Sequence, residues 1–586
     1  MPKIHKTRES SRIRSKQRVP VTHQTAWFGL DFTVWMLVVV VALAAGLRLH
    51  RLDTLPPGLH TDEAANAWNA YCLLKTGTDQ QGVRWPVPYL RAFGDNRSTL
   101  YVYLLLPFQA VGGLNVWTTR LPGAVGGVVT VLLLYWIGTR LADSTVGLTA
   151  ALLLAVNPWH LQQCRWGHEA SIVPLLIVLP MTCMVWAGLP PFSSSSARPR
   201  PVIAVLAGVL AGAGCYGYPA VRFFWPVFLL LAVIANWREW RAAIHTQRRK
   251  TVAVFLLSFL LIFLPLVWKH AKDEAINKRA QTNWVWSEED SFTQKAFKAA
   301  RRFPGHFGPD FLFMHGDRDI ALSPPPGVGL FLWDSLVWMA LGTAFLIRTA
   351  KSFPTSRWLA VWLLAYPAGD LLTRHAGLHA LRSLPGVCAL VLLSAIGVSI
   401  GGKWVWFRFT RQGPLVAVSI GVAIAALHLF FLSNFFTGLE VSPDKRKVMY
   451  MEDLLEASRW MKPRLASVDA VFCTSSNMSH PYIYTLIGTE YEPAEWFRDQ
   501  PEIVAGPLAG GAYANEDVCL RYGKFRFMHN GTSVTELQRL VANGRPDHVL
   551  FAVRPGELGL EKSARPIMVF RNRFGEESLW IFDTQI

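Results

Sequence analysis

The sequence is poor in charged residues. Only 17% of its 586 residues are Asp, Glu, Lys or Arg and 51% are apolar, whereas an ordinary soluble domain carries about 25% charge. The seven cysteines show no CxxC spacing, and the chain has neither a Gly-rich nucleotide fingerprint nor an internal repeat. These absences disfavour a single soluble globule, a structural zinc site and a repeat architecture.

Long apolar runs are what the sequence has instead. Segments of the ~17 to 25 residues that cross a bilayer recur from residue 27 to residue 433, which predicts a polytopic helical membrane protein. The eleven segments run at 27–47, 120–140, 146–163, 171–189, 201–218, 221–236, 251–269, 327–347, 358–373, 381–400 and 414–433. A twelfth candidate, 98–113, is short and contains Pro107, so its hydropathy alone is compatible with a span or with an interfacial helix.

The distribution of charge indicates the sidedness of the chain. Residues 434–586 hold 17 Lys and Arg against 20 Asp and Glu, so the formal net charge of +18 comes from the first 433 residues. If 98–113 does not span, the N-terminal tail and the basic short loops share one side, with 21 Lys and Arg against three acids. The positive-inside rule makes that side cytoplasmic. Topology therefore explains the basic excess, and we expect no nucleic-acid partner.

We expect three regions from this topology. They are a basic cytoplasmic tail at 1–26, an eleven-span transmembrane region at 27–433 and an extracytoplasmic domain at 434–586. The transmembrane region carries a large first external loop at 48–119 and a long external loop at 270–326.

The C-terminal region has the pattern of a small α/β domain. A helix-like stretch at 450–464 is followed by β-branched and apolar runs at 470–473, 548–553 and 567–570. Cys473 and Cys519 both lie in this region, so an oxidising compartment would allow them to form a disulfide.

Two adjacent carboxylates, Asp62 and Glu63, open the first external loop after Leu55-Pro-Pro-Gly-Leu-His60-Thr. They lie about fifteen residues after the first span. A carboxylate near the low-dielectric boundary can act as general base on a hydroxyl or hold a cation. The same residues also suit a helix start, with Thr61 or Asp62 as N-cap of a helix over 63–74, and the two roles are compatible.

These motifs resemble the membrane-embedded GT-C glycosyltransferases, especially the protein O-mannosyltransferase and lipid A aminoarabinose transferase group. Prolines followed by Asp62-Glu63 at the head of a helix resemble the signature of that group's first external loop. Further matches follow in order: Thr119-Arg120-Leu-Pro-Gly-Ala, Asn157-Pro-Trp-His160, Cys164-Arg165-Trp-Gly-His168-Glu169, Phe311-Leu-Phe-Met-His315-Gly-Asp317 and Leu381-Arg382-Ser-Leu-Pro385. The resemblance covers roughly residues 27–400.

The resemblance implies a transmembrane catalytic domain that takes a sugar from a polyprenyl-phosphate donor. The acceptor would be a hydroxyl of a protein, lipid or polysaccharide on the extracytoplasmic face of the plasma membrane, the inner membrane of a bacterium. Asp62 would be the catalytic base, with Glu63 supporting it or contacting substrate. The leaving lipid phosphate needs cations, and the arginine fork suits phosphate oxygens. Candidates on the same face are Arg97, Arg165, Arg374 and Arg382. Ser383 departs from the tyrosine that many relatives have after this arginine.

The second external loop concentrates further polar residues. We expect His168 and Glu169 to contact substrate, although a hydrogen bond between their own side chains would explain them as well. The resemblance does not identify a cofactor that the reaction would require. As an alternative, Asp95 and Glu169 could hold a divalent metal.

The main rival hypothesis is a transporter or flippase of lipid-linked sugars. Transporters usually bind at the midplane through broken helices and often carry inverted repeats. Here no repeat is found, charges avoid the span centres and the external loops are large. The sequence therefore favours the transferase.

Overall fold

The computed structural model describes most of the chain. The residues it does not describe are 1–25, 28–29, 193–197, 274–275, 277–283, 288, 318–328, 374–376, 409–412, 441–449, 477, 479, 506–516, 529–547, 558–564, 573–574 and 585–586. Almost all of the predicted basic tail and the candidate Arg374 lie outside the described residues.

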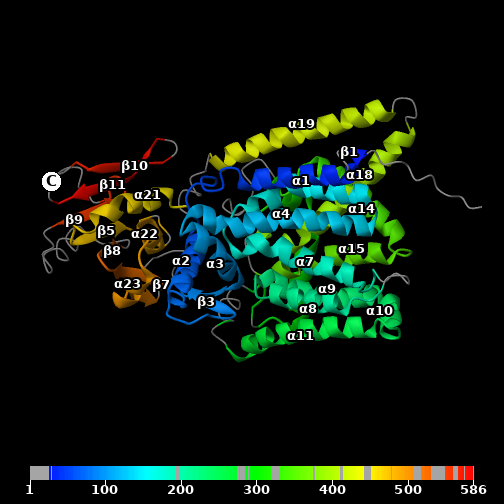
Figure 1. Cartoon of the computed structure of the whole chain (residues 1–586), viewed down its shortest axis with the longest axis horizontal. Coiled ribbons are helices and arrows are strands. Elements are labelled where there is room, and N and C mark those ends of the chain that lie inside the picture. Colours follow the sequence, from blue (N-terminus) through cyan, green and yellow to red (C-terminus); the bar gives the residue numbers. More distant parts are fainter. Residues whose placement is uncertain are drawn as a thin grey trace, which may run out of the picture.

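Helices overlap every one of the eleven apolar segments. The helices of this region are α1 (Phe32–Leu49), α4 (Val116–Leu141), α5 (Ser144–Val156), α6 (Pro158–Cys164), α7 (Val173–Ala187), α8 (Pro201–Gly214), α9 (Pro219–Ala235), α10 (Trp237–Ile244), α11 (Arg249–Lys272), α14 (Asp334–Thr349), α15 (Pro354–Ala365), α16 (Ala368–Leu371), α17 (Ala380–Ser383), α18 (Val387–Arg408) and α19 (Gly413–Glu440). Among them, α10 lies between two apolar segments and overlaps neither. These helices form a bundle that runs along the long axis of the molecule (Figure 1).

The helices differ in their capacity to span a membrane. Within the described part of the chain, six are long and apolar enough to cross alone: α1, α4, Glu169–Ala187, α11, Ala380–Arg408 and the Val418–Leu439 part of α19. α9 and α10 pass the same test as a pair that bends by 87°. α5, with 13 residues, rises only about 20 Å, less than a ~30 Å hydrocarbon core. The eleven-span topology therefore stays a prediction.

The first external loop folds into α2 (Thr61–Thr76), the hairpin of β3 (Tyr89–Ala92) and β4 (Asp95–Ser98), and α3 (Leu100–Gly112). α3 contains Pro107, packs against α2 and α4, and at 13 residues is too short to cross a membrane alone. α2 and α3 lie at the end of the bundle nearest the C-terminal sheet (Figure 1). This position agrees with the interfacial interpretation of 98–113.

The C-terminal region forms a seven-stranded mixed sheet with the order β10-β11-β9-β5-β8-β7-β6. Its strands are β5 (Ala470–Thr474), β6 (Glu502–Ala505), β7 (Asp517–Tyr522), β8 (Phe525–Met528), β9 (Val549–Val553), β10 (Met568–Arg571) and β11 (Glu577–Asp583). β5 is parallel to β8 and β9, and the other pairs are antiparallel. The helices are α21 (Glu452–Met461), α22 (Pro481–Thr489) and α23 (Pro493–Arg498). Cys473 and Cys519 are buried and free, so the structure contains no disulfide between them.

One apolar core joins the first external loop to the C-terminal region. Its buried members include Trp68 of α2, Val102 of α3, Ile483 of α22 and Trp496 of α23. Trp68 and Trp496 meet edge to face at 6.2 Å, and the Trp496 indole donates to the carbonyl of Gln80 at 3.0 Å. Burying large aromatic side chains in a shared core favours one fixed arrangement of the two parts.

Candidate functional site

The side chain of Asp62 lies at the start of α2 between a guanidinium and an imidazole. Arg97 Nη2, from the end of β4, is 2.6 Å from Asp62 Oδ1, and His168 Nε2 is 3.4 Å from Asp62 Oδ2. The Asp62 side chain is 22% exposed, whereas that of Glu63 is completely buried. Of the two adjacent carboxylates, only Asp62 is therefore open to a reactant.

The local sequence explains why Asp62 takes this position. α2 begins at Thr61, and its N-cap is His60, whose Nδ1 accepts a hydrogen bond from the Asp62 amide at 3.1 Å. The Glu63 carboxylate completes a capping box by accepting from the His60 amide at 2.8 Å. The expectation that Thr61 or Asp62 is the N-cap was wrong by one or two residues. Asp62 instead occupies the first turn, where the helix dipole favours its negative charge.

The electrostatics keep Asp62 ionised. Burial raises the pKa of the Asp62 carboxyl, but the Arg97 guanidinium and the hydrogen bond from His168 lower it by more, so that this pKa lies well below its ordinary value of 3.8. Burial lowers the pKa of His60, in agreement with a neutral ring whose Nδ1 accepts the Asp62 amide. A carboxylate is therefore present at this point throughout the neutral pH range.

Glu63 holds the loop and does not face the open side of the site. Its two carboxylate oxygens accept from Arg120 Nε at 2.8 Å and Arg120 Nη2 at 3.0 Å, and also from the Gly167 amide at 2.7 Å. Arg120 Nη1 and Nη2 reach further, to the carbonyls of Leu52, Pro56 and Gly58 at 2.6 to 3.0 Å. The pair fixes the chain before Asp62 and joins it to α4 and to the His168 loop. Because these bonds occupy the Glu63 carboxylate, they leave it no position from which to contact a substrate. They agree with the other expected role of Glu63, which is to support Asp62.

Arg165 is also engaged with backbone. Its side chain is fully buried, and Nη1 and Nη2 donate to the carbonyls of Leu47, Arg48, His50, Arg51 and Leu55 at 2.7 to 3.2 Å. These carbonyls lie at the C-terminal end of α1, where orphan groups need donors. The structure therefore corrects the expectation that Arg165 binds a substrate phosphate, because both terminal nitrogens are already occupied.

His168 and Glu169 form one wall of the site. His168 Nδ1 accepts from the Ala170 amide at 3.0 Å, which leaves Nε2 to donate toward the carboxylates of Glu169 at 3.0 Å and Asp62. The imidazole stacks on Trp166 with centroids 4.6 Å apart. The hydrogen bond between His168 and Glu169 is present, and His168 in addition touches Asp62, so it can orient that carboxylate.

Arg382 lies on α17, close to Tyr218. The charges of Asp62, Glu169, Asp317 and Arg382 all act on the Tyr218 hydroxyl, and the Tyr218 ring lies 6.1 Å from the His168 ring. Tyr218 therefore connects Arg382 with the Asp62 site. Nη1 of Arg382 is buried and has no hydrogen-bond partner in the part of the chain that the structure describes. A guanidinium nitrogen in that condition is costly unless a ligand supplies an acceptor.

The predicted metal pair gains no support from the geometry. Asp95 lies on β4, two residues before Arg97. In the described residues, no group of three or more His, Cys, Asp or Glu side chains has the arrangement of a metal site. Neither Asp95 nor Glu169 therefore acquires the further ligands that a divalent ion would need.

The C-terminal region touches the Asp62 segment directly. Thr61 Oγ1 and the Tyr484 hydroxyl are 3.0 Å apart, and His60 forms an isolated antiparallel bridge with Tyr450. Gly58, with φ at +68°, passes so close to Glu452 that a Cβ there would lie 2.8 Å from the Glu452 nitrogen. The site is therefore enclosed by residues from the bundle, the first loop and the C-terminal region.

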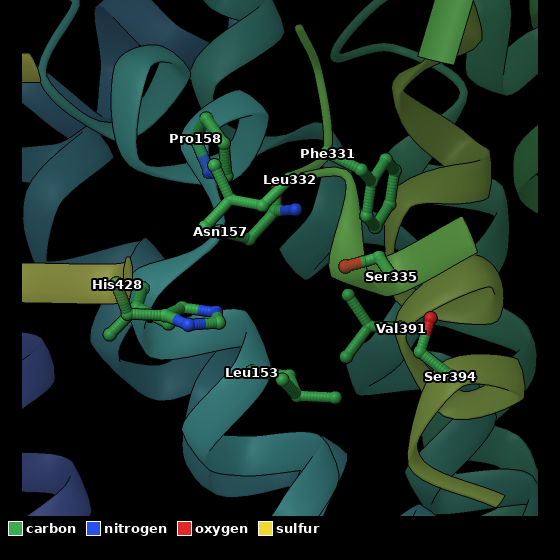
Figure 2. A pocket seen from close by; sticks show the side chains of 10 residues that line it. Leu153, Asn157, Pro158, Phe331, Leu332, Ser335, Val391, Ser394 and His428 are labelled. Atoms are coloured by element: carbon green, nitrogen blue, oxygen red, sulfur yellow. The ribbon is translucent and has the colours of Figure 1, made fainter. Parts of the chain in front are cut away.

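A small cavity inside the bundle is separate from this site. Ten residues of α5, α6 and the residue between them, of α14 and the segment before it, and of α18 and α19 line this cavity, which has room for roughly one water molecule. Figure 2 shows His428 and Ser335 on opposite sides of it. None of its lining residues belongs to the Asp62 site.

Solved structures, and neither family models nor curated sequences, identify the fold of this chain. No protein-family model and no curated protein sequence matches the chain. The apo structure of ArnT from Cupriavidus metallidurans superposes with a TM-score of 0.53 at 14% identity, over 94% of this chain and 98% of that one. The same protein bound to undecaprenyl phosphate gives 0.52 at 13%, with the same coverage. The oligosaccharyltransferase AglB from Archaeoglobus fulgidus gives 0.49 at 11%, over 90% of this chain and 70% of that one. The chain has the fold of the GT-C membrane glycosyltransferases, as the motifs predicted.

Proposed function

We propose that this protein is a glycosyltransferase that moves a sugar from a polyprenyl-phosphate donor to an acceptor hydroxyl at the extracytoplasmic face of the membrane, with Asp62 as general base. The observation that carries the proposal is the presence, in one site, of an ionised and partly exposed Asp62 and of an Arg382 nitrogen that is buried and has no hydrogen-bond partner among the described residues. The likeness to ArnT, a protein solved with undecaprenyl phosphate, supports the class of donor.

On the acceptor side, the low pKa of Asp62 limits the mechanism. A weakly basic carboxylate does not remove a proton from a free alcohol, so proton transfer has to accompany bond formation. As the sugar develops oxocarbenium character, the acceptor oxygen bonds to the anomeric carbon and its proton becomes acidic. The bond to the lipid phosphate breaks, and the acceptor proton ends on Asp62. His168 and Arg97 hold the carboxylate in place.

On the donor side, the leaving phosphate takes up negative charge as the sugar departs. Arg382 Nη1 offers a donor that no described group uses, and it lies in a buried setting where charge-assisted hydrogen bonds are strong. Arg97, already paired with Asp62, adds positive charge nearby. Glu63 and Arg120 act as positioning residues, since their bonds go to protein groups alone.

Arg382→Met should raise the KM for the donor by about 10- to 100-fold, the effect of losing one hydrogen bond to a charged group, which is worth ~1.5 to 3 kcal/mol. Because the unpartnered nitrogen destabilises the donor-free protein, the same variant should unfold no more easily than wild type. Arg382→Lys should fall between the two, since lysine lacks the planar fork. Donor titration and thermal unfolding measure the two effects. An unchanged donor KM would remove Arg382 from the donor site.

Arg97→Gln should move the acid limb of the pH–activity profile upward by about one to three pH units. Arg97 is the principal group that lowers the pKa of Asp62, so its loss raises that pKa. Ionised Asp62 then disappears at a higher pH as the solution is acidified. The limb is measured relative to each variant's own plateau, which separates the shift from any loss of rate. Arg91→Gln is the control, because Arg91 lies on the same hairpin but pairs with Asp517. Coincident profiles for wild type and Arg97→Gln would contradict this assignment of the base.

The proposed function is tested with the purified full chain in lipid nanodiscs and vesicles, supplied with radiolabelled polyprenyl-phosphate sugars and hydroxyl acceptors. We expect label to leave the lipid and appear on an acceptor. If the labelled lipid instead changed leaflets with its sugar attached, the transporter hypothesis would replace the transferase.

A further inference from the structure

Helix α13 (Phe292–Arg302), in the long external loop, presents an apolar surface that the rest of the protein does not cover. Not one of its eleven residues is buried. Phe292 is 85% exposed and Phe297 is 69% exposed, values far above those of ordinary surface phenylalanines. The helix is nevertheless well formed, since Ser291 and Gln294 make a capping box at its N-terminus.

A surface helix of a soluble protein turns its apolar face toward the core, whereas α13 exposes its apolar face. At 100° per residue, Phe292, Ala296, Ala300 and Phe297 share one broad side. All four are exposed. The half-buried positions, on the opposite side, are Lys295, Lys298, Ala299 and Arg302. The apolar face therefore points away from the protein, whereas Lys298 and Arg302 lie against it. Lys295 is only half-buried and makes no ion pair among the described residues.

Two ion pairs form on the half-buried side of α13, one within the loop itself and one to α16. Lys298 Nζ is 2.5 Å from Asp290 Oδ2, just before the helix. At the other end, Arg302 Nη2 bonds to Asp370 Oδ2 at 3.2 Å and to the Gly377 carbonyl at 2.8 Å. His306 Nε2 also meets Asp370 Oδ2, at 3.1 Å. The outward direction of the phenylalanines is thus fixed by the protein.

Asp370, the residue to which Arg302 binds, places α13 beside the end of an apolar segment. Asp370 belongs to α16, at the C-terminal end of the apolar segment 358–373, and α13 packs against α16. Just before α13, the Val285 amide donates to the Leu372 carbonyl at 3.1 Å. Trp284 and Trp286 flank that bond, with ring centroids 4.5 Å apart. Tryptophans gather at the membrane–water interface.

The charge of α13 identifies the occupant of its surface. The helix carries Lys295, Lys298, Arg301 and Arg302 and no acidic residue. Lys298 and Arg302 are paired within the protein. Arg301 is exposed, and neither Lys295 nor Arg301 has a carboxylate partner in the described residues. An apolar face flanked by cations complements a lipid surface with anionic head groups.

We propose that α13 docks into the outer leaflet of the membrane, with Phe292 and Phe297 at the head group–acyl boundary and with Lys295 and Arg301 against anionic phospholipid head groups. This inference does not depend on sugar transfer. It has a structural consequence for the site, because Asp370, to which α13 is tied, lies beside Gly369, which packs against the Arg382 carbonyl. Docking would fix the height of the Arg382 segment relative to the lipid surface.

The test is a nitroxide attached at Phe297→Cys in the full chain, reconstituted in nanodiscs of phosphatidylglycerol and phosphatidylcholine. All seven native cysteines are buried, so the introduced thiol is the one that labels, and unsubstituted protein measures the background. Arg498→Cys on α23, at a side chain 71% exposed, gives the reference for water. Leu257→Cys on α11, at a residue 67% exposed, gives the reference for lipid.

We expect the label at 297 to collide with oxygen more often than the label at 498 but less often than the label at 257, and with a water-soluble nickel complex at least tenfold less often than the label at 498. In phosphatidylcholine alone, or with Lys295→Glu and Arg301→Glu added, nickel collisions at 297 should rise at least threefold. Nickel collisions at 297 equal to those at 498 in every lipid would overturn the docking proposal. A protected label that ignores both the anionic lipid and the charge reversal would overturn the assignment of anionic head groups.

Discussion

Sugar transfer by Asp62→Asn is expected to fall by about 10²- to 10⁴-fold, the range that a positioned general base contributes. The amide has nearly the same shape and still fits the first turn of α2, but it cannot accept a proton. The transfer assay measures the loss, with thermal unfolding as the measure of integrity. Because the Asp62 side chain is partly exposed, we expect only a small change in stability from its lost pair with Arg97.

Two variants make the Asp62 result specific. Asp53→Asn removes an exposed carboxylate from the same loop and should leave transfer within about twofold of wild type, since surface substitutions away from a site have small effects. Asp62→Glu keeps the charge and moves the oxygens by one methylene, so it should retain more transfer than Asp62→Asn. Asp62→Asn with wild-type turnover would exclude Asp62 as the base.

Arg120→Met is expected to destabilise the protein by roughly 3 to 5 kcal/mol, the cost of leaving a buried charge without its partner. Glu63 is completely buried, and Arg120 supplies two of its hydrogen bonds together with bonds to three loop carbonyls. Unfolding by heat or denaturant in detergent measures the change. Transfer should fall as well, because the Arg120 guanidinium holds the chain that leads to Asp62.

A double variant separates the ion pair from general disruption. Glu63→Gln combined with Arg120→Met leaves no buried charge at this point, so it should be more stable than Arg120→Met alone. Arg91→Met, which breaks an exposed pair with Asp517, should cost less than about 1 kcal/mol. If Arg120→Met proved no more harmful than Arg91→Met, the loop would not depend on the buried pair.

The elements that the sequence predicted well are those governed by local pattern. The apolar runs predicted the bundle helices because a helix that crosses a membrane needs apolar side chains over a length set by the thickness of the hydrocarbon core. The stretch at 450–464 and the run at 470–473 likewise match α21 and β5, within two or three residues at each end. The interfacial position of α3 stays a prediction from charge counting, which depends on composition and not on packing.

The role of each polar residue depended on partners that are distant in sequence. Arg165 was an attractive phosphate ligand until its nitrogens proved to be bonded to carbonyls more than one hundred residues away. Glu63 could not be told from Asp62, because burial separates them and burial arises from the packing of Arg120 and Gly167. Tyr218 and His60 gave no signal in the sequence, since neither belongs to a spacing that predicts chemistry.

What the sequence determined by itself was a chain of apolar helices with two adjacent carboxylates near the start of the segment that follows the first helix. It could do so because hydropathy, charge asymmetry and a motif of adjacent residues are local properties. The tertiary structure alone decided which carboxylate is open, that a terminal nitrogen of Arg382 is buried without a partner among the described residues, and that the C-terminal sheet shares a core with the first loop. Those distinctions rest on burial and on hydrogen-bond partners, and both exist only when segments far apart in the chain are packed together.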